Sequence, residues 1–263
     1  MNSFKIWLLE NNIDFVTKQH INYSSNIVIT LFYLPQIKLD IFFADICLNT
    51  STETHPNIPE SSNAIWIWQD RWTHKKQIVK NRILYKLEGV KSIAARDTVC
   101  GKVSESEASK FLNEHHLFGS CSSKYRVGLY YKNILVALAA FTWPRKYYKE
   151  DGTIEKSFGL ARHCTLTGIQ IPGGLSKLMS YFENTYKPHN IFTAIDLDWG
   201  HGNSYTLANF IKGELYPSEK FYLETKNLIR YKKHEEKPET GNFIEIFNQG
   251  YQVYRRYYKK TEV

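Results

Sequence analysis

The 263-residue sequence is poor in cysteine and has no long apolar run, and each shortage excludes a class of protein. Its four cysteines, Cys47, Cys100, Cys121 and Cys164, are scattered, with no Cys-x-x-Cys pair and no metal-ligand spacing. A disulfide scaffold or a structural zinc site is therefore not expected, and reduced thiols in a cytoplasmic protein are the simplest interpretation. No apolar run approaches the roughly 20 residues of a membrane span, and the N-terminus is charged too early for a signal peptide. We expect no membrane partner.

Acidic residues are also fewer than basic ones. The chain has 26 Asp and Glu against 34 Lys and Arg, a formal net charge of +8. This balance favours a polyanionic partner, because each phosphate that is neutralised releases a counterion. Aromatic residues are abundant, with 18 Tyr and six Trp, and they stack on bases as well as fill cores. A basic protein without such a partner is the alternative.

The most informative stretch runs from residue 161 to residue 210. Residues 161–171 are mostly β-branched and apolar, which predicts a strand or a broken strand pair. Gly173 and Gly174 then precede apolar residues at helical spacing from Leu175. A Gly-rich turn that opens a helix exposes backbone N–H groups at the positive end of the helix dipole, which suits a phosphate. A tight connection without a ligand is the alternative.

A strand at 191–197 and a short helix around 204–209 should follow. The order of strand, loop, helix, strand and helix resembles the core of the GNAT acyltransferase superfamily. The GNAT loop pattern Q/R-x-x-G-x-G/A is matched in part by Gln170, Gly173 and Gly174, while Leu175 stands where the last small residue should be. The resemblance implies acetyl-CoA or another acyl donor, bound by these three residues and Ser176.

Candidate catalytic residues surround a second GNAT signature, a Tyr five residues before a Phe, which Tyr205 and Phe210 match. The resemblance implies that Tyr205 protonates the departing thiolate, and a core tyrosine is the alternative. Asp196 and Asp198 follow the predicted strand, and alternation would place both on one face of an extended segment, where an Asp could accept a proton from an amine. Helix capping is the simpler role for these aspartates. His163, on the preceding strand, completes the candidate set.

The segment before this stretch predicts further elements of the same core. Ser104 and Glu107 form a capping-box pattern that opens a helix ending at His115. Residues 126–131 and 134–141 predict a β-hairpin around Lys132-Asn133. In the GNAT pattern these would be the first helix and the second and third strands. The resemblance itself covers residues 161–210, and with these elements it implies a GNAT-like domain over residues 100–263.

The N-terminal hundred residues resemble a different fold. Apolar patterns predict a helix at 4–12, strands at 27–32, 37–46 and 64–68, a polar loop at 49–63 and a basic helix at 72–87. Residues 90–99 read as a connecting strand. The stretches WLLENNIDF, YLPQIKLDIFF and IWIWQDRW, followed by KKQIVKNRI, resemble the very-short-patch-repair branch of the PD-(D/E)xK nucleases.

Those nucleases hold a metal ion with carboxylates on two core strands. The matching positions here are Thr30 and Phe42, which cannot bind a metal. The resemblance therefore implies a restriction-endonuclease-like domain that has lost cleavage and has no metal site. An active metal-dependent endonuclease is the alternative if another register recruits Asp40, Asp45 or Asp70.

Basic residues beside aromatic ones mark candidate nucleic-acid contacts. In the stretch 143–149, WPRKYYK, cations suit phosphates and rings suit an unstacked base. An ordinary solvated loop is the alternative. The candidates, drawn from this stretch, the basic helix and the later strands, are Lys75, Lys76, Arg126, Arg145, Lys146 and Arg162.

Together these patterns predict a chain of the α/β (α+β) class with two domains. Residues 1–99 would form the nuclease-like domain and residues 100–263 the GNAT-like, mixed-sheet domain. A GNAT-like domain on a DNA-binding protein resembles the Mom family of phage DNA-modification proteins. That resemblance implies acyl transfer to a nucleobase amine, adenine above all, on an extruded base of double-stranded phage or mobile-element DNA. A non-catalytic nucleic-acid-binding protein is a further alternative.

Overall fold

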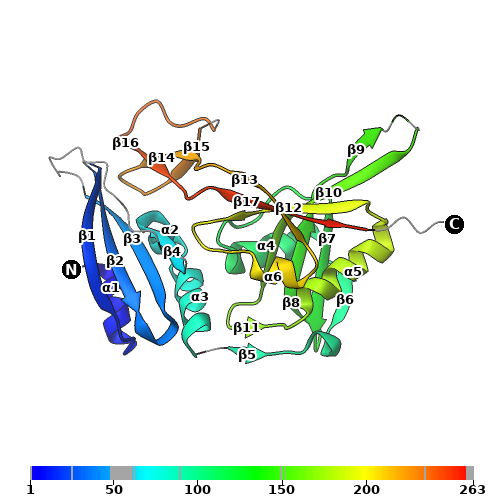
Figure 1. Ribbon diagram of the computed structural model, residues 1–263, viewed down its shortest axis with the longest axis horizontal. Coiled ribbons are helices and arrows are strands. Elements are labelled where there is room, and N and C mark those ends of the chain that lie inside the picture. Colours follow the sequence, from blue (N-terminus) through cyan, green and yellow to red (C-terminus); the bar gives the residue numbers. More distant parts are fainter. Residues whose placement is uncertain are drawn as a thin grey trace. The chain divides into compact units, whose positions relative to one another are not determined.

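The computed structural model describes residues 2–24, 26–47, 61, 63–88, 90–148, 150, 152–233 and 235–258 (Figure 1). The chain divides into two compact units that are both discontinuous in sequence. Unit 1 takes residues 1–79, 196–200 and 217–250, and unit 2 takes residues 80–195, 201–216 and 251–263. The compact units divide the chain at points other than the predicted boundary between residues 99 and 100. That boundary concerns domains that fold independently, and it stays a prediction.

Unit 1 contains a four-stranded sheet in the order β1-β2-β3-β4. Its strands are β1 (Val16–Ser24), β2 (Ile27–Leu34), β3 (Leu39–Ile46) and β4 (Ala64–Trp68). Helices α1 (Ser3–Glu10) and α2 (Gln69–His74) flank it, and α3 (Lys76–Glu88) begins in this unit. A second sheet, in the order β15-β14-β16, comes from residues far along the chain: β14 (Lys220–Glu224), β15 (Arg230–Lys232) and β16 (Phe243–Phe247).

Both faces of β2, β3 and β4 are largely buried, so these three strands are apolar runs rather than alternating ones. On one face Phe4 of α1 stacks on Phe43 with 5.0 Å between ring centroids, and Trp72 of α2 meets Phe4 edge-on at 5.2 Å. The other face packs on the second sheet in a cluster that includes Ile29, Leu31, Phe42, Trp66, Phe221, Leu223 and Ile246. One face of the N-terminal strands is therefore covered by residues that come more than 150 positions later in the chain.

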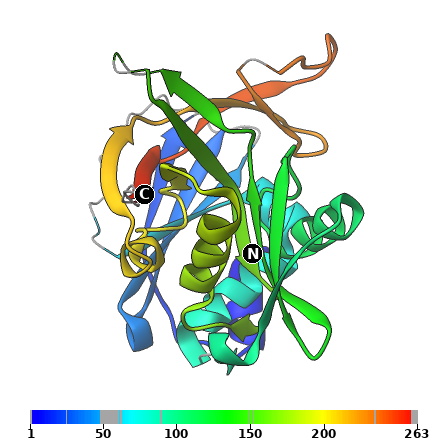
Figure 2. The ribbon, with the colours of Figure 1, turned by 90° about the vertical axis from the view of Figure 1, so that its right-hand side faces the viewer.

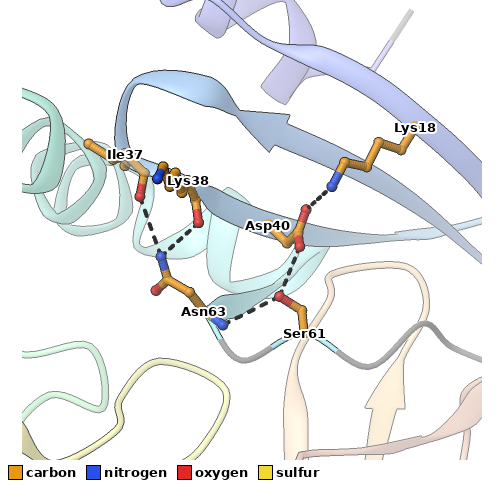
Figure 3. Close-up of polar contacts among 6 residues, drawn as sticks. All are labelled: Lys18, Ile37, Lys38, Asp40, Ser61 and Asn63. Atoms are coloured by element: carbon orange, nitrogen blue, oxygen red, sulfur yellow. Dashed lines mark hydrogen bonds and ion pairs between the residues drawn. The ribbon is translucent and has the colours of Figure 1, made fainter.

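A polar network surrounds the start of β3, where this strand begins to pair with β4 (Figure 3). The carboxylate of Asp40 accepts hydrogen bonds from Lys18 Nζ and Ser61 Oγ, each at 2.8 Å. The amide of Asn63 donates to the carbonyl oxygens of Lys38 at 2.8 Å and Ile37 at 3.4 Å. These contacts hold the chain where it enters the parallel strand β4.

Unit 2 contains an eight-stranded mixed sheet. Seven strands run in the order β13-β17-β12-β10-β8-β7-β6, and β9 pairs with β10 beyond this path. Their bounds are β6 (Val99–Lys102), β7 (Tyr125–Tyr131), β8 (Ile134–Phe141), β9 (Arg145–Tyr148), β10 (Ile154–Thr165), β12 (Asn190–Asp196), β13 (Ile211–Tyr216) and β17 (Tyr251–Tyr257). A small parallel pair, β5 (Lys91–Ser92) with β11 (Ile169–Gln170), lies apart from it.

Helices cover this sheet on both sides (Figure 2). Helix α5 (Gly174–Tyr186) packs through Leu178, Met179 and Phe182 on one side, which we call the α5 face. Helix α4 (Glu105–His115) packs through Phe111 and Leu112 on the other side, the α4 face. Helix α6 (Asn203–Leu207) follows β12. The predicted order of strand, loop, helix, strand and helix over residues 161–210 is thus confirmed.

Local predictions fare well where turn and cap chemistry is explicit. The backbone N–H of Glu107 donates to Ser104 Oγ at 3.2 Å, which confirms the predicted start of α4. Lys132 and Asn133 both have positive φ, 50° and 62°, as a two-residue hairpin turn requires. The predicted hairpin between β7 and β8 is therefore confirmed.

Other predicted elements are wrong in detail. The helix predicted at 72–87 is two helices, α2 and α3, that join at Lys75. The connecting strand predicted at 90–99 is instead β5, a 3-10 turn at Ala95–Asp97 and the start of β6. The strand β1 is an additional element that the sequence pattern did not indicate. The polar loop at 49–63 falls almost entirely outside the described residues.

The four cysteines are free thiols, which agrees with the absence of a disulfide framework. Among the helices that the structure describes, none combines the length and the apolar character needed to cross a membrane.

Candidate active site

The site begins where strands β10 and β12 stop pairing. These two parallel strands pair over only three positions, Ser157 with Asn190, Phe158 with Ile191 and Gly159 with Phe192. Beyond Gly159 and Phe192 both strands continue without a shared register. Two parallel strands that separate in this way leave polar backbone groups that a ligand can use. The opening also lies at the carboxyl end of β12, where α/β sheets place ligands.

A bulge in β10 decides which side chains face this opening. The pairing of β10 with β8 shifts between Leu160 and Arg162, so one extra residue stands on β10. Leu160 pairs with Phe141 and His163 with Ala139, both of which belong to the core on the α5 face. Arg162 pairs with Ala140, which belongs to the core on the α4 face. His163 and Arg162, which are neighbours on the strand, therefore point to opposite faces and do not line one site together.

Tyr205 comes to the same opening from α6. Its ring packs edge-on against Phe210 at 5.5 Å between centroids and lies 6.0 Å from that of Tyr254. Its hydroxyl interacts with that of Thr193 on β12, the residue directly after the last paired position. Thr193 donates its own proton to the carbonyl oxygen of Leu160 at 2.9 Å, so it is free to accept the phenolic proton. Burial raises the pKa of Tyr205 to about 12.

Thr193 was not predicted from the sequence. No motif marks it, and its position becomes informative only once the two strands are seen to separate beside it. Its hydroxyl links the carbonyl of Leu160 at the bulge to the phenol of Tyr205. The Tyr205 phenol therefore lies where β10 and β12 separate, and the Thr193 hydroxyl orients it.

His163 stands on the α5 face of β10. Burial lowers the pKa of His163 to about 4, so its imidazole is neutral at pH 7. A neutral imidazole donates one hydrogen bond and accepts another. In this state His163 is suited to hold or position a polar group rather than to supply positive charge.

This depressed pKa predicts a pH dependence of stability. In the unfolded chain His163 becomes protonated below about pH 6.5, whereas in the folded chain it becomes protonated only near pH 4. The free energy of unfolding should therefore fall over this interval, by about 1–2 kcal/mol after allowance for the partial exposure of the side chain. We expect His163→Gln to remove that part of the loss, as measured by urea unfolding at pH 7 and pH 4.5. His201→Gln, at an exposed position, is the control, and an equal response of both variants would refute the assignment.

The predicted anion loop precedes α5. Gly173 has φ of 77°, which glycine adopts without strain, and it caps the helix without any side-chain hydrogen bond. A side chain at Gly174 would stand 3.0 Å from Ile171 and 3.3 Å from Leu129, so the turn is tightly packed. The N–H of Gly174 bonds to Ile171 and that of Lys177 to Gly173, which leaves those of Leu175 and Ser176 in the first turn.

Gln170 is positioned rather than free. It lies in β11, where its side-chain oxygen accepts a hydrogen bond from Tyr85 Oη at 3.0 Å. Its carbonyl oxygen accepts from the N–H of Ile93. Ser176 is half-buried in the first turn of α5. The backbone N–H groups of this turn suit a phosphate, and the role of the Gln170 side chain stays a prediction.

Asp196 and Asp198 do not lie on one face of an extended segment, so that prediction is wrong. The chain turns directly after β12, because the N–H groups of Trp199 and Gly200 both bond to the carbonyl oxygen of Asp196. The Asp196 carboxylate accepts from the N–H of Asp198 at 3.0 Å. These residues belong to unit 1, whereas Tyr205 belongs to unit 2. Their role as a base stays a prediction.

Asp198 is buried within unit 1. Its carboxylate accepts the N–H of Gln249 at 2.8 Å, and its carbonyl oxygen accepts the N–H of Trp66 at 2.7 Å. Burial, with the neighbouring Asp196 carboxylate as a second cause, raises the pKa of Asp198 far above its ordinary value. Asp198 thus ties the turn to strand β4.

The predicted nucleic-acid contacts separate into two groups. Arg162 donates to the carbonyl oxygens of Gly119 and Ala161, and Arg126 donates to those of Val103 and Ser123. Both arginines therefore hold local backbone. Arg145, Lys146 and Lys76 are exposed, although the Lys76 ammonium lies 5.2 Å from the Trp72 ring centroid, and Lys75 is half-buried.

The carboxylates considered for a nuclease do not converge. Asp40 contacts Lys18 and Ser61, whereas Asp45, at an odd offset along the same strand, contacts Asn2. Both oxygens of Asp70 accept hydrogen bonds from Arg230. Within the described part of the chain, no group of three or more His, Cys, Asp or Glu side chains gathers for a metal ion.

Asp45 predicts a second pH effect on stability. Burial raises its pKa from 3.8 to about 6, so its ionised form is disfavoured in the folded state. The free energy of unfolding is therefore highest at low pH, where Asp45 is protonated in both states, and it declines as the pH rises through about 6. We expect Asp45→Asn to raise the free energy of unfolding by about 1 kcal/mol at pH 7.5 and to leave it unchanged at pH 4. Urea unfolding measures it, with Asp97→Asn at an exposed site as the control, and a loss of stability at pH 7.5 would contradict the prediction.

Comparisons with known proteins give structural likeness only. No family model matches the sequence, and no curated protein matches it. A GNAT family acetyltransferase from Elizabethkingia anophelis, solved with acetyl-CoA bound, is 10% identical, with a TM-score of 0.39 over 62% of this chain and 99% of that one. The Bacillus subtilis acetyltransferase in complex with CoA is 12% identical, with a TM-score of 0.38 over 62% of this chain and 98% of that one.

A third similar structure is FeeM, an N-acyl amino acid synthase from uncultured soil microbes. It is 11% identical, with a TM-score of 0.30 over 70% of this chain and 91% of that one. At such identities and scores, the chemistry of this chain is inferred from its own geometry.

Proposed function

We propose that the chain transfers an acyl group from a CoA thioester to a nucleobase amine in DNA, with adenine as the expected base. The observation that carries the proposal is the separation of β10 from β12 after three paired positions, with the Tyr205 hydroxyl beside it. A reacting thioester needs a proton donor near its sulfur. Tyr205 supplies the proton donor, and the hydroxyl of Thr193 orients it. The bulge at Leu160 supplies separated backbone, and all three belong to unit 2.

The first turn of α5 fits the phosphate end of such a donor. Its N–H groups at Leu175 and Ser176 lie at the positive end of the helix dipole, and no acidic side chain stands in that turn. The glycines at 173 and 174 allow a turn in which a side chain would be strained at residue 173 and crowded at residue 174. The donor would supply the activated acyl carbonyl.

The chain's residues then act on the leaving group and the acceptor. Tyr205 holds a proton at its phenolic oxygen and donates it toward the departing sulfur. His163, neutral at pH 7, positions a polar group on the α5 face. The acceptor amine must also lose a proton as it attacks, and solvent water is proposed to take it. Because a base amine is stacked in the duplex, the acceptor nucleotide would be extruded.

Mass spectrometry of nucleosides tests the proposal. DNA from cells that express the chain should contain a nucleoside heavier by an acyl group, and this adduct should be absent from cells that express Tyr205→Phe. An unchanged nucleoside profile in both cultures would refute a DNA-modifying function. Analysis of RNA from the same cells would then examine the other nucleic acid as acceptor.

A further inference from the structure

The open part of the α4 face carries a ring flanked by two guanidinium groups. Gly159 pairs with Phe192, and Ser157 pairs with Arg145 on the other side of β10, so cross-strand neighbours place Arg145 and Phe192 on one face. The Arg145 and Arg255 guanidinium carbons lie 5.3 Å and 6.0 Å from the centre of the Phe192 ring. A side chain at residue 159 would stand 3.1 Å from this ring, so glycine keeps the space that the ring occupies.

These two arginines differ from Arg126 and Arg162, which donate to backbone carbonyls. Within the part of the chain that the structure describes, neither Arg145 nor Arg255 forms an ion pair with a carboxylate. Two like charges around one ring repel each other, and an anion between them relieves the repulsion. The arrangement therefore suits a phosphate more than a neutral ligand.

Strand β9 extends this surface along an arm formed with the start of β10 (Figure 1). Tyr147, two residues from Arg145, shares its face and is 49% exposed. Trp143, just before the arm, is 65% exposed, and the Lys124 ammonium lies 4.1 Å from its ring centre. On the other face of the arm Lys146 stands directly opposite Lys156. Like charges in that position destabilise a strand pair, which a bound polyanion would reverse.

The exposed rings of Tyr147 and Trp143 and the half-buried ring of Phe192 lie beside cations, and this combination matches a single nucleic-acid strand. Phosphates bind guanidinium and ammonium groups, while unstacked bases lie on aromatic rings. In a duplex the bases are stacked on each other, so these rings would have no role. We infer that Phe192, Arg145, Arg255 and Tyr147, which we call the Phe192 surface, bind a single-stranded segment of nucleic acid, with Trp143 and Lys124 beside them. In the reaction proposed above, this segment would be the unpaired stretch around the acceptor base.

Fluorescence anisotropy of the full chain with a labelled single-stranded oligonucleotide tests the surface. It needs no acyl donor, so it can succeed where the transferase function fails. We expect binding that weakens with salt, and an Arg145→Ala/Arg255→Ala variant that binds about tenfold more weakly. Its salt slope should be smaller by about 1.4, since each phosphate contact on a single strand contributes about 0.7. Lys110→Ala, an exposed cation on α4, is the control and should bind as the unchanged chain does.

A second variant separates stacking from charge. Phe192→Leu keeps both arginines but removes the aromatic ring, and we expect about tenfold weaker binding with an unchanged salt slope. DNA and RNA oligonucleotides in parallel assays identify the sugar that is preferred. Circular dichroism confirms that each variant is folded. Equal binding of duplex and single strand with no effect of Phe192→Leu, or a double variant that binds like the control, would overturn the inference. So would an acidic peptide that competes as well as the oligonucleotide.

Discussion

Replacing Arg230 by methionine should lower the free energy of unfolding of unit 1 by about 3–5 kcal/mol. Asp70 and Arg230 form a buried bidentate pair, with N–O distances of 2.9 and 2.8 Å and side-chain exposures of 3% and 8%. Without the guanidinium, the ion pair that remains to Asp70 among the described residues is with Arg71, whose Nε is 3.9 Å away. A buried carboxylate with so little compensation is costly, because water no longer solvates it. Urea unfolding at pH 7 measures the change.

Two controls identify the cause of that loss. Arg96→Met removes one member of an exposed pair, with exposures of 88% and 56%, and should change stability by less than about 1 kcal/mol. The double replacement Asp70→Leu/Arg230→Met removes both charges, so it should be far less destabilising than Arg230→Met alone. If Arg230→Met costs no more than Arg96→Met, the pair does not stabilise this unit as argued.

Tyr205→Phe should slow acyl transfer about 10²–10³-fold, the usual effect of removing one hydrogen-bond donor to a developing negative charge. The variant keeps the ring that packs on Phe210 and Tyr254, so the fold should survive. Since burial raises the pKa of Tyr205 to about 12, its phenol keeps its proton over the whole range in which the protein can be assayed. The rate should therefore not decline with rising pH through ionisation of this residue.

The time course of adduct formation on DNA measures that effect. Tyr181→Phe is the matched control, because Tyr181 also packs against the core of unit 2 but lies on α5. A Tyr205→Phe variant that modifies DNA at the rate of the Tyr181→Phe variant would exclude Tyr205 as the proton donor. A complete loss of folded protein, seen by circular dichroism, would instead identify a packing role.

The sequence was most informative where local chemistry dictates conformation. Lys132-Asn133 and Gly173 needed only turn rules, and Ser104 needed only capping rules. The face that each of His163 and Arg162 takes was beyond such rules, since one extra residue in β10 inverts every later side chain. Alternation failed in the same way at Asp196 and Asp198, where side-chain and backbone hydrogen bonds bend the chain into a turn.

Long-range partners were equally hidden. The run IWIW at β4 indicated a strand, but nothing in it identifies its partners Phe221, Leu223 and Ile246, which come from β14 and β16. Asp70 resembled a metal ligand in the sequence because Arg230, which occupies both its oxygens, lies 160 residues later. Patterns of one segment cannot show which distant segment covers it.

The discontinuity of unit 1 also governs how the chain can fold during its synthesis. Strands β2, β3 and β4 leave the ribosome long before β14 and β16, which cover Ile29, Leu31 and Phe42. At about 5–20 residues per second, the interval is on the order of 10–40 s. During that time the nascent sheet presents an uncovered apolar face, so slow translation or a premature stop before residue 217 should favour aggregation or chaperone capture.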